Sequence, residues 1–141
     1  IRLRTRAWSE RLTLDDALEE YAVNYSKGMK KKLALACALL HDPEVLLLDE
    51  PTNGLDPYAT RAMHEILRER SAAGKTVLFS THLLDQAERL CRRVAIVYQG
   101  RLAALGTLDE LRAQRTSGEN SLEEIFFSVT GGAAEPVVPG S

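Results

Sequence analysis

The chain has 141 residues, 45% of them hydrophobic, and a formal net charge of −2. This size and composition suit one compact unit, or a large piece of one, and exclude a mostly disordered chain. The near-zero charge excludes a global basic field for nucleic acid, and no apolar run reaches the roughly 20 residues needed to span a bilayer.

The N-terminal third predicts helices. A helical stretch ends near Leu12, a short helical turn is expected over residues 15–20, and Ser26 opens a helix that runs to about Leu40. Because the chain opens without an initiator methionine or a capped helix start, we expect it to be part of a longer protein. Both cysteines fall on apolar stripes of expected helices, which predicts buried, reduced thiols rather than a disulfide or a metal site.

Three consecutive lysines, Lys30 to Lys32, follow the start of the helix at Ser26. A helix start carries partial positive charge, so each cation there costs about a few tenths of a kcal/mol. A visiting anion such as a phosphate group would offset this concentration of charge. The alternative is that the lysines extend into solvent, and for the individual lysines we favour it over direct phosphate contact.

Two apolar runs predict strands of a parallel sheet. EVLLLDE, residues 44–50, is nearly continuous and bounded by prolines, which is typical of a strand buried on both faces. A helix is expected from about residue 59, and Gly74 stands where its C-terminal cap belongs. KTVLFST, residues 75–81, predicts a second buried strand.

The last third continues the alternation of helices and strands. A helix is expected over residues 83–91, and RVAIVYQGRLAALG predicts two strands joined at QG. Two further helices begin near Leu108 and Leu122, and residues 133–141 predict a flexible tail. Strands separated by amphipathic helices predict an open α/β sheet.

Polar residues follow the two expected buried strands. In open α/β sheets, ligands bind beyond the carboxyl ends of the strands, where this chain has Asp49, Glu50 and His82. Four apolar residues ending in Asp match the Walker B pattern, whose aspartate holds Mg²⁺, and a following glutamate can act as a base. From the residues alone, two plainer interpretations stay open: acidic residues that end a strand in solvent, and a histidine satisfied by local hydrogen bonds.

Four motifs occur in register between residues 25 and 82: YSKGM, VLLLDEP, TNGLDP and STH. Together they resemble the nucleotide-binding subunits of ABC transporters. The resemblance implies an α/β, partial P-loop NTPase fold with a mostly parallel sheet flanked by helices and part of the helical signature subdomain. It also implies ATP and Mg²⁺ as cofactors. YSKGM departs from the commonest signature, LSGGQ, and together with SLEEIFFSVTGG it resembles the exporter-type branch with separate membrane subunits.

The resemblance implies a role for each matching residue. Ser26 and Gly28 match the signature loop, which in the family binds the γ-phosphate of ATP held by the opposite subunit. Asp56 matches the loop that crosses the dimer interface.

The same resemblance assigns the catalytic positions. Asp49 matches the aspartate linked to Mg²⁺, and Glu50 matches the catalytic glutamate. His82 matches the switch histidine that contacts the γ-phosphate.

The sequence contains no P-loop of the form G-x-x-x-x-G-K-[ST]. AAGKT, residues 72–76, is a near match, but Glu69 occupies the position of the first glycine and the segment leads into a strand. We therefore expect the chain to correspond to the C-terminal half of the domain and not to hydrolyse ATP unaided. The parent protein is expected to hydrolyse ATP as a dimer.

The expected layout has four parts: residues 1–24 in the helical subdomain, 25–106 with the signature helix and the C-terminal part of the ATPase core, 107–132 as C-terminal helices, and the tail 133–141. The function this predicts is an ATP-binding and ATP-hydrolysing subunit of an ABC transporter, present as a fragment. Its expected partners are a second ATP-binding subunit and a transmembrane permease, through which it would lie on the cytoplasmic face of the cell membrane.

Two alternatives to that function stay open. One is a non-catalytic protein that supplies its signature residues in trans to an intact ATPase. The other is an ABC-type ATPase that acts on nucleic acid or translation, but such proteins usually carry long insertions that this sequence does not contain. We therefore expect no nucleic-acid partner.

Overall fold

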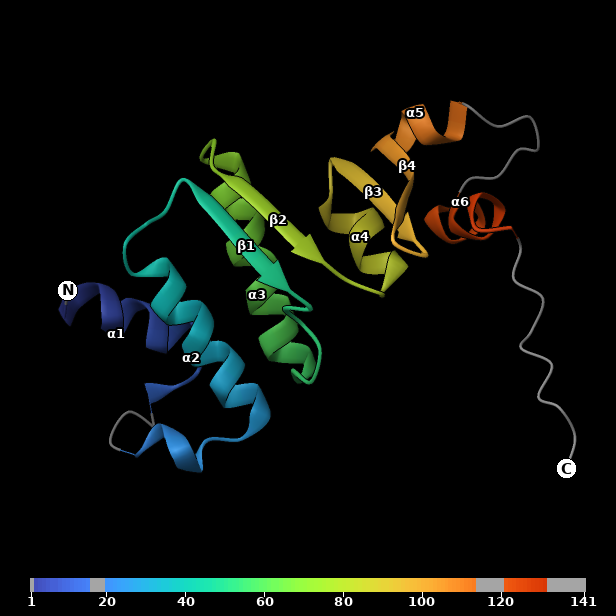
Figure 1. The fold of residues 1–141 in the computed structure, drawn as a ribbon. Helices are drawn as coiled ribbons and strands as arrows, with labels where there is room; N and C mark the ends of the chain where they lie inside the picture. Colours follow the sequence, from blue (N-terminus) through green and yellow to red (C-terminus); the bar gives the residue numbers. More distant parts are fainter. Residues whose placement is uncertain (1, 16–19, 114–120, 132–141) are drawn as a thin grey trace, which may run out of the picture. The chain divides into compact units, whose positions relative to one another are not determined.

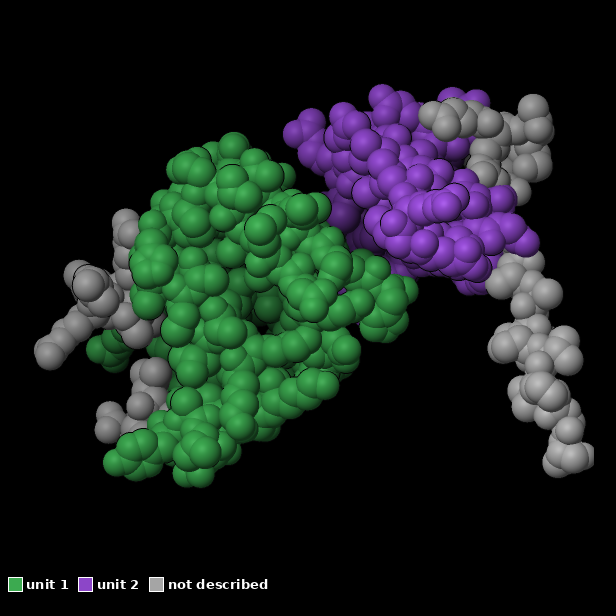
Figure 2. Space-filling model, in the orientation of Figure 1, with its two compact units in different colours: residues 1–82 green, residues 83–141 purple. Residues whose placement is uncertain are grey.

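The computed structural model describes residues 2–15, 20–113 and 121–131 (Figure 1). The chain forms two compact units, residues 1–82 and residues 83–141, which Figure 2 colours separately. Each unit has its own hydrophobic cluster and its own pair of strands.

The described part of unit 1 contains these helices and strands: α1 (Arg2–Arg11), the 3₁₀-helix η2 (Ala22–Asn24), α2 (Lys27–Leu39), β1 (Val45–Asp49), α3 (Pro57–Ala72) and β2 (Thr76–Ser80). Ser26 caps α2 as expected, since its hydroxyl accepts a hydrogen bond from the Met29 amide at 3.2 Å. Gly74, with a φ of +82°, follows the end of α3 in the left-handed conformation that a glycine adopts at low cost. Both helix ends are therefore set by local sequence.

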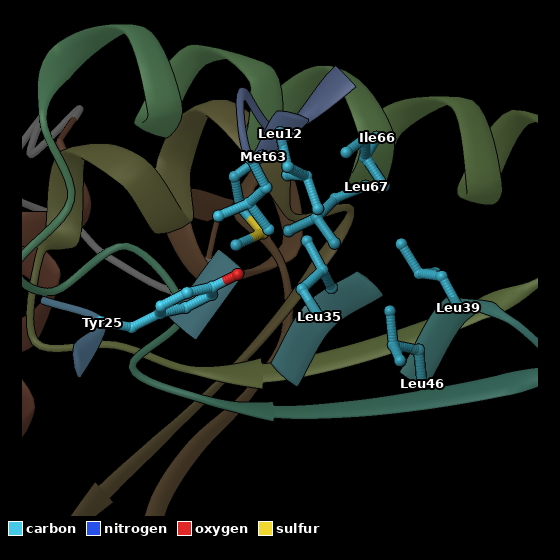
Figure 3. Packing of buried hydrophobic residues seen from close by; sticks show 9 residues of the cluster. Leu12, Tyr25, Leu35, Leu39, Leu46, Met63, Ile66 and Leu67 are labelled. Atoms are coloured by element: carbon cyan, nitrogen blue, oxygen red, sulfur yellow. The ribbon is translucent and has the colours of Figure 1, made fainter. Parts of the chain in front are cut away.

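Strands β1 and β2 pair in parallel, in a register that runs from Val45 opposite Thr76 to Asp49 opposite Ser80. One face of this pair packs against α2 and α3. Figure 3 shows Leu35 and Leu39 of α2 and Met63 and Ile66 of α3 converging on the side of β1 that carries Leu46. The core of unit 1 thus lies between the sheet and the helices.

The opposite face of the β1–β2 pair is exposed, which corrects the expectation of strands buried on both sides. Leu47 and Leu78 are 68% and 64% exposed, and Val45 is 56% exposed. Alternate residues of a strand point to opposite faces, so each strand buries only the set that meets the helices. In the part of unit 1 that the structure describes, no element covers the other set.

Unit 2 contains α4 (Leu84–Leu90), β3 (Arg93–Tyr98), β4 (Arg101–Thr107), α5 (Leu108–Ala113) and α6 (Leu122–Val129). Strands β3 and β4 pair antiparallel, and Gln99 and Gly100, which join them, both have positive φ, as a two-residue hairpin turn requires. Ile96, Leu111, Leu122 and Ile125 form the centre of the cluster between hairpin and helices. The expected α/β class is confirmed, with a parallel strand pair in unit 1 and an antiparallel one in unit 2.

Other expectations are met only in part. Cys37 is exposed and Cys91 is half-buried, so the prediction of two buried thiols is wrong, although burial does raise the pKa of the Cys91 thiol. The helical turn expected over residues 15–20 falls mostly on residues 16–19, outside the described part, as does the tail 133–141. Among the described helices, none is long and apolar enough to cross a bilayer.

Candidate functional site

The parallel register brings three of the predicted site residues to the same end of the β1–β2 pair. Asp49 is the last residue of β1 and lies opposite Ser80, the last residue of β2; Glu50 and His82 follow within two residues. The Ser80 hydroxyl donates a hydrogen bond to Asp49 Oδ1. The Glu50 amide in turn lies 3.2 Å from both the carbonyl oxygen and the hydroxyl of Ser80. Ser80, which the sequence did not single out, thus fixes the adjacent carboxylate residues.

Glu50 and His82 form a direct pair. Glu50 Oε1 accepts a hydrogen bond from the His82 amide at 3.0 Å and lies 2.8 Å from His82 Nδ1. The other oxygen, Glu50 Oε2, is shielded from solvent and has no hydrogen-bond partner among the described residues. The His82 side chain is 65% exposed, so the pair leaves one imidazole edge accessible. This arrangement holds the carboxylate by one oxygen and leaves the second oxygen without a hydrogen-bond partner among the described residues.

The backbone of Glu50 is strained. Its φ is +44°, in the left-handed region, which costs a residue with a side chain about 1–2 kcal/mol. Lys31 of α2 donates a hydrogen bond from Nζ to the Glu50 carbonyl oxygen. Strain of this kind, held in place by surrounding contacts, is common at functional sites.

The start of α2 packs against the loop that follows β1, residues 50–56. A Cβ atom added at Gly28 would lie 3.2 Å from the carbonyl oxygen of Gly54, which is closer than most such contacts allow. Gly28 therefore permits a close approach between the helix and the loop. The 13-residue helix α2 also offers unpaired amides and a positive potential at its start, which suits an anion.

Two of the three consecutive lysines have partners within the protein. Lys31 binds the Glu50 carbonyl oxygen, and the buried Lys32 has its Nζ 3.8 Å from Asp56 Oδ2 and 3.5 Å from Thr13 Oγ1. The expectation that these lysines extend into solvent is therefore wrong for Lys31 and Lys32, whereas Lys30 is exposed. The loop after β1 supplies the oxygen atoms that offset their charge.

Asp56 caps α3. Its Oδ1 accepts a hydrogen bond from the Ala59 amide at 2.9 Å, and Pro57 occupies the first turn. This hydrogen bond, helped by the nearby charge of Lys32, lowers the pKa of Asp56 below its ordinary value. The structure thus gives Asp56 a local role in the fold, and its predicted place at a dimer interface stays a prediction.

The residues at the strand ends fit a magnesium–nucleotide complex in part. Among the described residues, no group of three or more His, Cys, Asp or Glu side chains could hold a metal by itself. Magnesium in nucleotide sites is bound through one or two carboxylates, with phosphate and water oxygens completing its shell. Asp49 can supply such a carboxylate, and the unpartnered Glu50 Oε2 can accept a hydrogen bond from water.

Comparison with known proteins gives consistent matches. The family model described as "AAA domain, putative AbiEii toxin, Type IV TA system" matches residues 6–84. The ABC-type transporter ATP-binding protein EcsA of Bacillus subtilis is 38% identical over 117 residues, which cover 83% of this chain and 47% of EcsA. The Nod factor export ATP-binding protein I of Burkholderia pseudomallei is 54% identical over 81 residues, covering 57% of this chain and 27% of that protein.

The fold matches as well. A solved structure, described as that of an ATP-binding subunit of an ABC transporter, superposes with a TM-score of 0.86 at 38% identity, covering 92% of this chain and 54% of the other. The chain spans about half or less of the length of the curated relatives it matches. The similarity therefore concerns the part of those proteins to which these 141 residues correspond.

Proposed function

This chain belongs to the AAA-domain family whose model it matches and, with its relatives, to the ATP-binding proteins of ABC transporters, and we propose that it carries the residues that hydrolyse ATP in a transporter subunit. The observation that carries this proposal is the Glu50–His82 pair at the ends of β1 and β2. The sequence has no P-loop, so the triphosphate cradle would come from outside these 141 residues.

Glu50 is the proposed catalytic base. Its Oε1 is held by His82, which leaves Oε2 to accept a hydrogen bond, and then a proton, from the attacking water. Bound MgATP supplies the phosphoryl group and a cation that neutralises its developing charge. Asp49 would hold the metal, with Oδ1 oriented by the Ser80 hydroxyl. The exposed edge of His82 would meet the γ-phosphate.

The proposed partners follow from the other matched residues. Ser26 and Gly28, at the start of α2, would bind the γ-phosphate of ATP held by a second subunit, and Asp56 would lie at that dimer interface. A transmembrane permease would bind the dimer and keep it at the cytoplasmic face of the membrane. The likeness to a Nod factor export protein favours the exporter-type branch.

A chimera tests the proposal. In this chimera, the 141 residues replace the segment of EcsA that they match, so that the remaining part of EcsA supplies the upstream half of the domain. We call this protein the EcsA chimera. We expect Mg²⁺-dependent ATP hydrolysis, and we expect Glu50→Gln to lower kcat by about 10²–10⁴-fold, the usual contribution of a general base. Glu65→Gln is the matched control, because Glu65 is an exposed carboxylate of α3 that pairs with Arg61 on the surface.

Two outcomes would replace the proposal. Hydrolysis that Glu50→Gln leaves unchanged would remove Glu50 from the reaction. The second outcome has two parts: the chimera is inactive, and the free 141-residue chain stimulates ATP hydrolysis by intact EcsA. If Ser26→Arg in the free chain abolishes this stimulation, the result would support the alternative of a protein that supplies signature residues in trans.

A further inference from the structure

We propose that Lys31 is a positioning residue for Glu50: its ammonium group holds the Glu50 carbonyl and thereby keeps the Glu50 carboxylate turned toward His82. The inference rests on the proposed function, in which Glu50 is the base. In this proposal α2, the helix that begins at the signature residues, positions the catalytic residue of the same subunit.

The contact that carries the inference joins two elements far apart in sequence. Lys31 lies one turn into α2 and is half-buried, and its Nζ donates to the carbonyl oxygen of Glu50, 19 residues later. A lysine near the start of a helix is electrostatically unfavourable, and an oxygen acceptor offsets part of this cost. The Glu50 carbonyl is such an acceptor.

Glu50 needs such a contact because its conformation is not one it would adopt by itself. Its φ of +44° is disfavoured for a residue with a Cβ atom, and the preceding peptide is held at the Glu50 amide by Ser80. Lys31 holds the following peptide at its carbonyl. With both flanking peptide groups held, the side chain is directed to His82, where Oε1 accepts a hydrogen bond from the amide and lies beside Nδ1 of the ring.

The neighbouring contacts of α2 do not duplicate that of Lys31. Lys32 meets Asp56, at the far end of the loop, and Gly28 approaches Gly54 in its middle. Of the contacts described between α2 and this loop, the one made by Lys31 bears on Glu50 itself. Ser26 and Gly28 lie at the start of the same helix that carries Lys31.

The kinetic test uses the EcsA chimera with three variants. We expect Lys31→Met to lower kcat by about tenfold to a hundredfold, the effect of a misplaced catalytic group, with little change in KM. Lys31→Arg, which keeps a cationic donor, should recover much of the loss. Lys30→Met is the matched control, since it removes the same charge from an exposed position of the same helix.

A second readout needs neither nucleotide nor chimera. In the 141-residue chain, the His82 amide donates to Glu50 Oε1, so its hydrogen exchange reports whether the carboxylate is in place. We expect exchange to become several-fold faster in Lys31→Met and to stay unchanged in Lys30→Met and Lys31→Arg. Thermal unfolding of each variant measures any loss of overall stability. Such a loss would also speed hydrogen exchange in α3.

The outcomes separate the two proposals. An active chimera in which Lys31→Met behaves as Lys30→Met in both kcat and His82 exchange overturns the role of Lys31 and leaves the proposed function intact. An inactive wild-type chimera removes the proposed function, while the exchange measurement still decides whether Lys31 positions Glu50. If exchange in α3 rises as much as that of His82, Lys31 is a general stabiliser and the inference fails.

Discussion

Each unit contains a glutamate that accepts hydrogen bonds from other residues, but the two glutamates differ in how many of their oxygens are engaged. In unit 2, Glu88 accepts hydrogen bonds from Arg112 at 2.7 Å and from the Leu122 amide at 3.3 Å, so its carboxylate ties helices together and both of its oxygens are engaged. In unit 1, Glu50 has a strained backbone, one engaged oxygen and one oxygen without a described partner. A carboxylate that is fixed in position but has an oxygen without a hydrogen-bond partner indicates a functional site, whereas a carboxylate with both oxygens hydrogen-bonded indicates a structural role.

A core substitution in unit 2 should cause the greatest loss of stability. Ile125 is 1% exposed within the cluster of that unit, so Ile125→Ala should cost about 2–5 kcal/mol through lost burial and the cavity it leaves. Chemical denaturation, followed by hydrogen exchange in both units, measures this loss. His82 amide exchange should stay as in the wild type, since the contacts of Ile125 lie in unit 2. Faster exchange at His82 would show that the contrast between the units is wrong.

The same substitution, glutamate to glutamine, should have opposite effects in the two units. Glu88→Gln weakens a charged hydrogen bond to Arg112 and one to the Leu122 amide, and should cost about 1–3 kcal/mol of stability without changing the kcat of the EcsA chimera. Glu50→Gln should do the reverse, with a large loss of kcat and little loss of stability. Both are measured by denaturation and by steady-state hydrolysis. Equal effects of the two variants on kcat would contradict the distinction.

A weaker effect is the pH dependence of stability in unit 1. Hydrogen bonds from Lys75 first, and then from Arg70, lower the pKa of Asp42 below its ordinary 3.8. A lowered carboxylate pKa adds stability that is present above the ordinary value and lost as the pH falls through the folded value. Asp42→Asn should therefore lower stability at neutral pH and flatten its decline in acid. Denaturation midpoints measured from neutral to acid pH test this prediction. If the stability of Asp42→Asn declines in acid as steeply as that of the wild type, groups other than Asp42 cause the decline.

Local signals predicted much of the fold. Ser26 and Gly74 set helix ends through hydrogen bonding and left-handed backbone geometry, and QG set the turn between β3 and β4. These features depend on residues a few positions apart, so the sequence contains the whole cause. The end of β1 was readable for the same reason, because an apolar run that stops at Asp49 is a local pattern.

Features that depend on distant partners were missed. The exposed face of Leu47 and Leu78 was not readable, because an apolar run does not say which element covers it. The partner of Lys31 lies 19 residues away and is a backbone carbonyl, which has no sequence signature. Ser80 likewise became a partner of Asp49 only through the register of two strands. For the candidate site, the sequence motifs identify the residues. The contacts that hold these residues depend on the register of β1 and β2 and on the loop after β1, which the sequence does not reveal.

The most direct measurement is a crystal structure of the EcsA chimera carrying Glu50→Gln, with ATP and Mg²⁺. We expect a dimer in which each γ-phosphate lies within hydrogen-bonding distance of His82 of one chain and Ser26 of the other, with Asp49 beside the metal. A nucleotide bound with its γ-phosphate away from His82 and from the start of α2 would contradict this expectation.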